Sequence, residues 1–287
     1  MSGTPVALPV TVLHGAGAGP VVWLSAAVHG DELCGIEIIR RVLSDVDPRR
    51  LAGTLIAVPV VNVHGFNTGS RYLPDRRDLN RSFPGSPRGS LASQLAHLLM
   101  REVVDRCSIG IDLHTGSDHR INLPQIRADL DDSETLALAR AFAAPIALHS
   151  RLRDGSLRQV AAESGTRVLL YEGGEANRFD PLAIEVGTAG IRRVLASQGM
   201  IDDRDAVAGE VLLSRKSRWM RATVSGVLGL GVALGDRVEE RATLGAIYDP
   251  FGKRLSQVRA RFAGVVIAHT QHPLVNRGDA VVHIAEV

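Results

Sequence analysis

The sequence predicts an α/β protein: a three-layer α/β/α core on a mostly parallel or mixed sheet, followed by a smaller all-β domain. Before about residue 200, strand-length apolar runs alternate with helically spaced apolar residues, a pattern typical of parallel sheets covered by helices. After about residue 205 the apolar runs are short, glycines break them, and no helical pattern appears. We therefore expect an α/β domain over residues 1–205 and a β-rich domain over 206–287.

Composition excludes several classes of protein. With 33 basic and 31 acidic residues, the chain lacks the excess positive charge of a nucleic-acid binder. No apolar run approaches the roughly 20 residues of a membrane-spanning helix, and the N-terminus does not resemble a signal peptide. Cys34 and Cys107 are far apart in the sequence, which favours two reduced thiols. We expect a soluble, cytoplasmic protein with no nucleic-acid or membrane partner; a homo-oligomer is left open.

The first elements form a βαβ unit. Residues 21–28 are a continuous apolar run, typical of a strand buried on both faces. Apolar spacing predicts a helix over 32–46, and 55–61 reads as a second strand. From 62 to 89 the periodicity vanishes, and a loop this long inside a domain is usually functional.

Ser90 is an expected N-cap for a helix that continues to Val103. The remaining α/β elements are predicted as a strand over 109–113, a loop over 115–131, a helix over 133–143, a strand over 145–148, a helix over 156–164, a strand over 167–171 and a helix over 181–197.

The C-terminal region contains a loose internal repeat: Gly-Asp-Arg-Val at 235–238 and Gly-Asp-Ala-Val at 278–281. The pattern resembles the half-barrels of biotinyl- and lipoyl-type domains. Lys253 does not lie in the sequence context of the modified lysine of those carriers. We therefore expect this domain to be structural or to cover a pocket.

Two histidines and a glutamate follow predicted strands. His29 and Glu32 are three apart where the first strand gives way to a helix, and His114 ends another strand. Two imidazoles and a carboxylate, with a fourth position for water, are the ligand set of a catalytic zinc site. Strand alternation puts Asp112 on the face of His114, either as a supporting partner of that histidine or as part of the pocket floor. The alternative is that these are polar residues capping strand ends.

The loop at 71–85 is rich in arginine. Its arginines favour planar recognition of a carboxylate, and the Asn80 amide can bind the same group: Arg71, Arg76, Arg77 and Arg81. The alternative is a solvated loop in which Asp75 and Asp78 pair with neighbouring arginines, above all Arg76.

Glu172 ends the strand at 167–171 and precedes two glycines, where a carboxylate can take a proton from an attacking water. Glu175 is the competing candidate.

Three motifs in order carry a resemblance to a known family: His-Gly-Asp-Glu at 29–32, Arg-Asp-Leu-Asn-Arg-Ser-Phe-Pro-Gly at 77–85 and Asp-Leu-His-Thr-Gly at 112–116. Together they resemble the succinylglutamate desuccinylase/aspartoacylase family of the zinc carboxypeptidase-like superfamily. The resemblance spans about residues 20 to 200, and the β-rich tail is also similar to that family's C-terminal domain.

The resemblance implies a role for each matching residue. One zinc ion per chain would be held by His29, Glu32 and His114. Asn80 and Arg81 would bind the substrate carboxylate, Arg71 would lie near the scissile carbonyl, and Glu172 would be the general base. Between Arg71 and Asn80 the chain is longer than in aspartoacylase-like members. Tyr248 is a candidate for a tail residue that reaches the site.

The expected function is zinc-dependent hydrolysis of the amide bond of a small, anionic N-acyl amino acid. One alternative is a zinc carboxypeptidase acting on short peptides. Another, from a different class, is a non-catalytic zinc- or ligand-binding relative.

Overall fold

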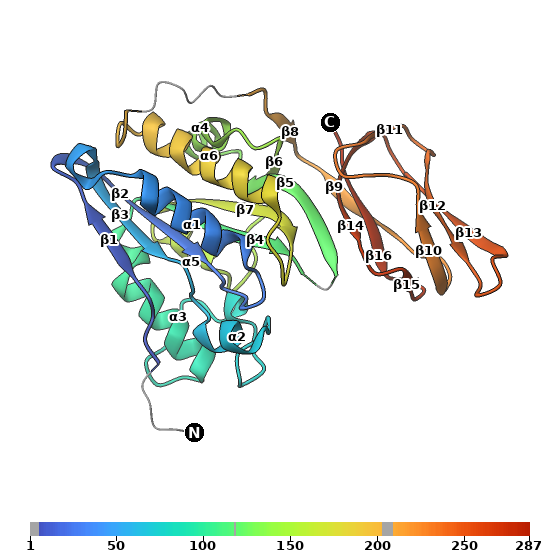
Figure 1. Ribbon diagram of the computed structural model, residues 1–287, viewed down its shortest axis with the longest axis horizontal. Helices are drawn as coiled ribbons and strands as arrows, with labels where there is room; N and C mark the ends of the chain where they lie inside the picture. The colour runs from blue at the N-terminus through green and yellow to red at the C-terminus, as the bar shows by residue number, and fades with distance from the viewer. Residues whose placement is uncertain (1–5, 118, 203–208) are drawn as a thin grey trace.

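The computed structural model describes residues 6–117, 119–202 and 209–287. An α/β body is followed by C-terminal strands that project to one side of it (Figure 1). The helices of the described chain are α1 (Cys34–Asp45), α2 (Val63–Thr68), α3 (Leu91–Glu102), α4 (Ser133–Phe142), α5 (Leu157–Glu163) and α6 (Pro181–Ser197). None of the helices in these ranges is both long and apolar enough to cross a membrane.

Most of the described strands belong to one large mixed sheet. Nine of them follow one another in the order β1-β3-β2-β4-β7-β5-β14-β16-β9, with β6, β8 and β11 paired beside this path. Their bounds are β1 (Thr11–His14), β2 (Gly17–Ala26), β3 (Ala52–Val58), β4 (Ile109–Gly116), β5 (Arg120–Ala128), β6 (Ile146–His149), β7 (Arg167–Glu175), β8 (Leu212–Ser214), β9 (Ser217–Arg221), β11 (Arg237–Val238), β14 (Gly264–Thr270) and β16 (Ala280–Ala285).

A second, antiparallel sheet lies in the C-terminal region, with strand order β13-β12-β10-β15. Its strands are β10 (Gly226–Leu230), β12 (Thr243–Tyr248), β13 (Arg254–Arg259) and β15 (Leu274–Val275). The prediction of an all-β C-terminal region is therefore confirmed for the residues that the structure describes.

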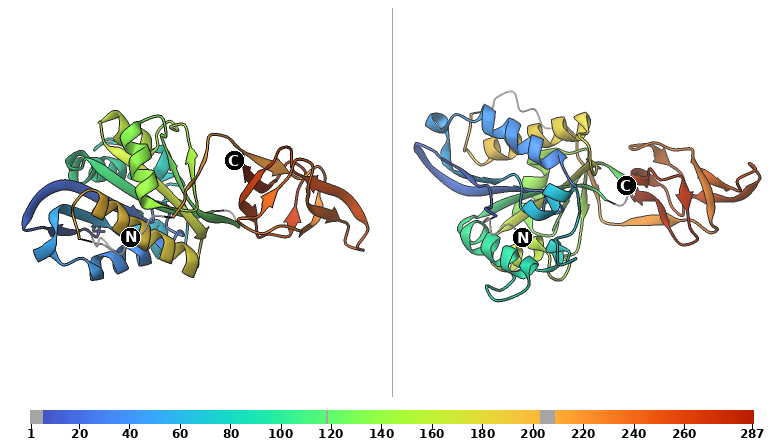
Figure 2. Two further views of the ribbon diagram at one scale, coloured as in Figure 1. Left: turned by 90° about the horizontal axis from the view of Figure 1, so that it is seen from above. Right: turned by 60° about the horizontal axis from the view of Figure 1, so that its bottom comes forward.

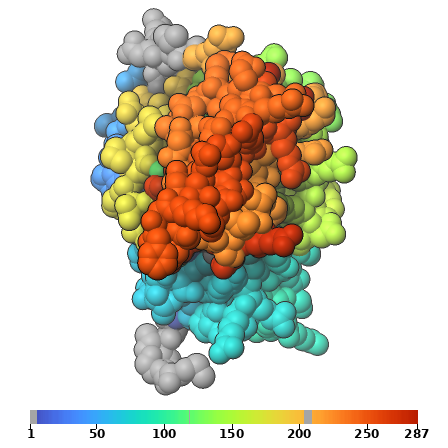
Figure 3. Space-filling model, turned by 90° about the vertical axis from the view of Figure 1, so that its right-hand side faces the viewer, coloured from blue at the N-terminus to red at the C-terminus, as the bar shows by residue number. Residues whose placement is uncertain are grey.

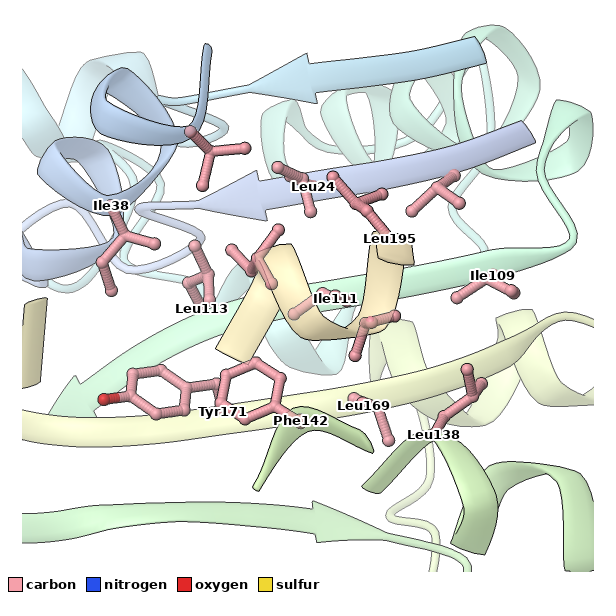
Figure 4. Packing of buried hydrophobic residues seen from close by; sticks show 14 of the residues in the cluster. Leu24, Ile38, Ile109, Ile111, Leu113, Leu138, Phe142, Leu169, Tyr171 and Leu195 are labelled. Atoms are coloured by element: carbon pink, nitrogen blue, oxygen red, sulfur yellow. The ribbon is translucent and has the colours of Figure 1, made fainter. Parts of the chain in front are cut away.

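The central strands β2, β3, β4 and β7 are parallel and buried on both faces. Leu24 and Ile111 pack with Ile38 of α1 and Leu195 of α6 on one face (Figure 4). Trp23, which points the opposite way from Leu24, packs into a second core with α3 and α5. The sheet between two helical layers confirms the three-layer prediction and explains why these strands read as continuous apolar runs.

Local capping fixes several helix boundaries. The Ser90 hydroxyl accepts a hydrogen bond from the Ser93 backbone N–H at 3.3 Å, as predicted for the start of α3. Asp180 caps α6, and Pro181 occupies its first turn. The strand predicted at 55–61 lies three residues earlier, as β3. The loop predicted from 62 to 89 contains the short helix α2.

The loop predicted over 115–131 is wrong, because most of it is β5, a nine-residue strand of the large sheet. Between Asn122 and Gln125 the pairing with β7 shifts by one residue, and Pro124 lies in this bulge. A bulge tolerates proline, which has no N–H to donate to the ladder. Polar residues that face a cavity replace the apolar alternation that would have revealed the strand.

The C-terminal strands continue the large sheet of the α/β body. β14 pairs with β5, in a register that places Ala268 opposite Asn122, and β16 and β9 follow. Figure 2 shows from two further sides how the C-terminal part extends from the α/β body, and in Figure 3 the C-terminal residues lie in front of that body. The predicted boundary at 205/206 lies outside the described residues and stays a prediction.

The repeat seen in the sequence is a structural repeat. The Asp236 carboxylate accepts a hydrogen bond from the Ala233 N–H at 2.8 Å, and the Asp279 carboxylate accepts one from the Asn276 N–H at 2.7 Å. The glycine before each aspartate has a positive φ, 87° and 97°. The same turn therefore leads into β11 and β16.

We predict that Gly110→Ala destabilises the protein by about 1–3 kcal/mol, because an added Cβ would lie 2.1 Å from the fully buried Trp23 ring. Urea denaturation measures the free energy of unfolding. Gly231→Ala is the control: its Cβ would make ordinary contact, so the change should stay within about 0.5 kcal/mol. Equal stability of the two variants would contradict the packing described here.

Candidate active site

The strands β2, β4 and β7 are parallel neighbours whose carboxyl ends meet at one edge of the sheet. His29 follows β2, and His114 lies near the end of β4. Glu172 is the register partner of His114 on β7, so the two side chains share one face of the sheet. β7 extends to Glu175, four residues beyond the predicted end, and places Glu172 inside the strand.

The turn at 29–32 is fixed by close packing of the backbone. The Glu32 N–H donates to the His29 carbonyl at 3.1 Å, which puts both side chains on one side of the turn. A Cβ on Gly30 would lie 2.0 Å from the Gly65 backbone, so only glycine fits there. The His-Gly-Asp-Glu motif thus packs against α2, in the segment that the sequence left as a loop.

His29, Glu32 and His114 converge, as the sequence predicted. The three side chains are buried, and one ligand atom of each lies within 4.8 Å of the others. Glu32 Oε1 is 2.8 Å from His29 Nδ1, and Glu32 Oε2 is 2.8 Å from His114 Nδ1. Both imidazoles therefore turn the same ring nitrogen toward one carboxylate.

A chain of hydrogen bonds from the core orients His114. Its Nε2 lies 2.8 Å from Asp112 Oδ2, and Asp112 Oδ1 accepts a hydrogen bond from Ser25 Oγ at 2.7 Å. The indole N–H of Trp23 donates to the same hydroxyl at 3.1 Å. Asp112 thus has the supporting position expected for it, and the two residues behind it come from β2.

Asp78 supports His29 in the same way, a role that sequence reasoning missed. Asp78 Oδ1 lies 3.2 Å from His29 Nε2, while Arg71 donates to Asp78 Oδ2 at 3.1 Å and to Glu32 Oε1 at 3.2 Å. The alternative interpretation of Asp78, pairing with a loop arginine, is therefore also correct. Its position 49 residues from His29 in the sequence gave no local signal.

The charges of the site stabilise one another. Burial disfavours a charged imidazole, but Glu32 and Asp78 outweigh it and raise the pKa of His29. Burial also works against a charged His114, but Asp112 and Glu32 outweigh this effect and raise the pKa of His114 well above its usual range. Burial works against the Glu32 carboxylate, yet the two histidines hold its pKa far below the ordinary value. The buried Glu32 carboxylate is therefore stabilised by positive charge beside it.

The donor set fits a divalent metal ion. Two imidazole nitrogens and a carboxylate oxygen form the set typical of a catalytic zinc site, and Asp112 and Asp78 hold the far nitrogen of each imidazole, as second partners of zinc-binding histidines do. With neutral imidazoles, the carboxylates of Glu32 and Asp112 would leave buried negative charge at the site, which a cation offsets.

Glu172 lines the same cavity as the three converging side chains. Its side chain is 16% exposed, its Oε2 accepts a hydrogen bond from Asn122 Nδ2 at 2.7 Å, and Arg127 Nη1 lies 4.0 Å from its Oε1. Glu175, the competing candidate, instead pairs with Arg178 at 2.9 Å. Asn122 and Arg127 belong to β5 and were missed with that strand.

The loop residues Arg71, Asn80 and Arg81 also line the cavity, and their binding of substrate stays a prediction. Asn80 Oδ1 accepts a hydrogen bond from the Leu157 N–H at 2.9 Å, which leaves the amide NH₂ as the donor for a ligand. Arg71 is held by Glu32 and Asp78. Arg76 is exposed, in agreement with the solvated alternative for that residue.

The cavity wall is strongly cationic. Six arginines line it against two acidic residues, Glu32 and Glu172; the arginines are Arg71, Arg81, Arg120, Arg127, Arg153 and Arg158. Burial and the neighbouring Arg127 and Arg153 lower the pKa of Arg158 to about 10. The buried Arg127 Nε has no hydrogen-bond partner among the described residues. Arginines this close together favour an anionic ligand.

Among the tail residues that the structure describes (209–287), Trp219 of β9 is the one that lines the cavity. Tyr248, the candidate named from the sequence, lies in the small sheet beside Gly229 and is not among the residues that line the cavity. The physical reason is that its strand, β12, belongs to the four-stranded sheet, which does not join the α/β body. Trp219 is one of two tryptophans in the sequence, and this rarity was the signal that could have drawn attention to it.

The family comparison agrees with this geometry. The model of the succinylglutamate desuccinylase/aspartoacylase catalytic domain matches residues 18–198, more than half of the chain. The chain belongs to this succinylglutamate desuccinylase/aspartoacylase family. Within the family, it is similar to an N-alpha-acetyl-L-2,4-diaminobutyric acid deacetylase of Halomonas elongata, with 31% identity over 98% of this chain and 86% of the relative.

Solved structures of the family share the whole fold. A product-bound structure of the ectoine utilization protein EutE (DoeB) from Ruegeria pomeroyi has a TM-score of 0.89 at 26% identity, covering 98% of this chain and 90% of that one. A succinylglutamate desuccinylase/aspartoacylase from Rhodobacter sphaeroides has a TM-score of 0.86 at 30% identity, with the same coverage. The likeness extends through the C-terminal strands.

We predict that His283, which stacks on Trp219, makes the protein sensitive to acid. Burial and the nearby Arg127 lower the pKa of His283 to about 3. An unfolded histidine titrates near 6.5, so the unfolded state binds more protons as pH falls from about 6.5 toward 3, and stability is lost in that window. His283→Phe should make the free energy of unfolding depend less on pH in this window, which urea denaturation at several pH values measures. An unchanged pH dependence would contradict the neutral, buried state of His283.

Proposed function

We propose that the chain is a zinc-dependent hydrolase that removes the acyl group from a small, anionic N-acyl amino acid. The observation that carries the proposal is the convergence of His29, Glu32 and His114 beside Glu172 in an arginine-lined cavity. The similarity to a deacetylase of acylated diaminobutyrate supports the same reaction class. We also propose that the protein acts in the cytoplasm, which suits its buried free thiols, Cys34 and Cys107.

His29, Glu32 and His114 would hold one zinc ion per chain. When bound, zinc would lower the pKa of the attacking water and polarise the scissile carbonyl. Asp112 and Asp78 keep the far ring nitrogens of the histidines occupied, so the Nδ1 atoms stay directed at Glu32. This arrangement presents the ligands in their binding orientation.

Glu172 acts as general base and then as general acid. Its carboxylate takes a proton from the attacking water and returns it to the nitrogen of the leaving amine as the amide bond breaks. Asn122 holds one carboxylate oxygen, which leaves the other to exchange the proton. Asn80 and Arg81 bind the substrate carboxylate and so orient the amide. Arg71, which donates to Glu32, would stabilise negative charge on the carbonyl oxygen.

The charge of the cavity selects the substrate. Six arginines line it, and the two acidic lining residues offset their charge only partly. An N-acyl amino acid with a neutral or acidic side chain gains from this field, whereas a cationic side chain is repelled. We therefore expect anionic substrates to be preferred over N-alpha-acetyl-2,4-diaminobutyrate, the compound for which the Halomonas relative is named.

The deciding experiment measures free-amine release by the zinc-loaded protein. The panel contains N-acetyl and N-succinyl derivatives of glutamate, aspartate, alanine and 2,4-diaminobutyrate, with blocked dipeptides beside them. Turnover of an acyl amino acid with the dipeptides inert supports the deacylase. Turnover of the dipeptides alone would move the chain to the carboxypeptidase alternative, and an inactive, zinc-bound protein would favour the non-catalytic one.

We predict that Glu172→Gln lowers kcat by about 10²–10⁴-fold while zinc content stays at one per chain, because the amide cannot accept the proton. Zinc is measured by atomic absorption and turnover by amine release. Glu175→Gln is the matched control on the same strand and should retain near-normal turnover, since Glu175 pairs with Arg178. Near-normal turnover in the Glu172 variant would exclude it as the base.

We predict that Asp112→Asn weakens zinc binding about 10–100-fold, because it perturbs the partner of His114 Nε2 without removing a ligand. His114→Ala, which removes a ligand, should abolish binding at equimolar zinc. Competition with a chromophoric chelator measures both affinities. Asp105→Asn, at an exposed position before β4, should bind zinc like the wild type. Full zinc retention by His114→Ala would overturn the ligand set.

A further inference from the structure

Trp219 is held at the cavity by the hydrogen-bonded framework of the sheet. Four residues on successive strands are register partners: Asn122 on β5 lies opposite Ala268 on β14, Ala268 opposite His283 on β16, and His283 opposite Trp219 on β9. Asn122 is also the residue that donates to Glu172. A continuous row across the sheet therefore links the proposed base to the tail tryptophan.

Ring contacts fix the orientation of the indole. Trp219 and His283 are stacked, with centroids 4.6 Å apart and planes inclined by 15°. The Arg120 guanidinium lies 5.3 Å from the Trp219 ring centroid, in a cation–π contact. His283 is buried, whereas Trp219 is only partly buried and lines the cavity. The indole is thus a rigid wall of the site, supported from behind.

We propose that Trp219 determines substrate specificity by limiting the size of the group that extends from the scissile amide toward β5. The inference rests on the proposed function. In the order of strands, Glu172 on β7 lies between the metal-ligand set, at the ends of β2 and β4, and Trp219 on β9. A substrate whose amide lies at Glu172 can therefore contact the indole only with the group on the β5 side of that amide. Trp219 touches the substrate, and His283 is a positioning residue that holds the indole in place.

The test is substrate selectivity, measured as kcat/KM over two series. One series varies the acyl group on a single amino acid (acetyl, butyryl, succinyl, benzoyl), and the other varies the amino acid under a single acyl group. Trp219→Ala should raise the relative kcat/KM of the larger members of one series by about 10-fold or more and leave the other series in its wild-type order. Zinc content should be unchanged.

Matched variants separate specificity from structural damage. Arg218→Ala changes an exposed residue on the same strand and should keep wild-type selectivity. His283→Ala should shift selectivity in the direction of Trp219→Ala, and His283→Phe, which can still stack, should restore it. A uniform loss over both series, or wild-type selectivity in Trp219→Ala, would overturn the proposal.

Ligand binding gives a readout that does not require turnover. Trp23 is fully buried and Trp219 lines the cavity, so fluorescence changes on binding should come from Trp219. Titration of the zinc-loaded protein with succinate and with N-acetylglutamate should change the emission of the wild type and leave that of Trp219→Phe unchanged. A response without turnover would retain the pocket assignment and reject the deacylase. An equal response in Trp219→Phe would reject the assignment of Trp219.

Discussion

The buried carboxylate of Glu32 joins parts of the chain that the rest of the site depends on. It contacts His29 in the turn after β2 and Arg71 in the 71–81 loop. It also contacts His114 of β4 and accepts a hydrogen bond from the Thr115 N–H of the same strand. A carboxylate this deeply buried is stable only with several partners. The loop, the turn and the strand therefore depend on one another, because each supplies a partner that this carboxylate requires.

Parallel strands make such a site predictable in part. His29, Glu32 and His114 could be found in the sequence because each follows an apolar strand, and a parallel sheet brings those strand ends together. The residues that support these side chains from distant parts of the chain could not be found in this way. Asp78 is 49 residues from His29 and looked like an ordinary loop aspartate. Strand β5 was missed because its cavity-facing residues are polar and Pro124 sits in a bulge, so the alternation expected of a strand is absent.

Charge is arranged in two layers around the site. Glu32, Asp78 and Asp112 surround the histidines, while the outer wall of the cavity is built mainly from arginines. The inner layer favours a cation and the outer layer an anion, which is the division that the proposed zinc ion and anionic substrate require. A chain of formal charge +2 achieves this by concentrating its arginines locally. Net charge alone therefore gave no indication of an anionic ligand.

Continuity of the sheet gives the C-terminal strands a direct part in the site. If the tail were joined only through a surface contact, the position of Trp219 would depend on a movable interface. Instead, β5 pairs with β7, the strand of Glu172, on one side and with β14 on the other, and β16 and β9 follow, so the ladder of backbone hydrogen bonds is continuous from β7 to β9. The family match ends at residue 198, before these strands. The proposed metal ligands and the proposed base thus lie inside the matched region, whereas Trp219 lies outside it, on a strand that the unbroken sheet attaches to the same site.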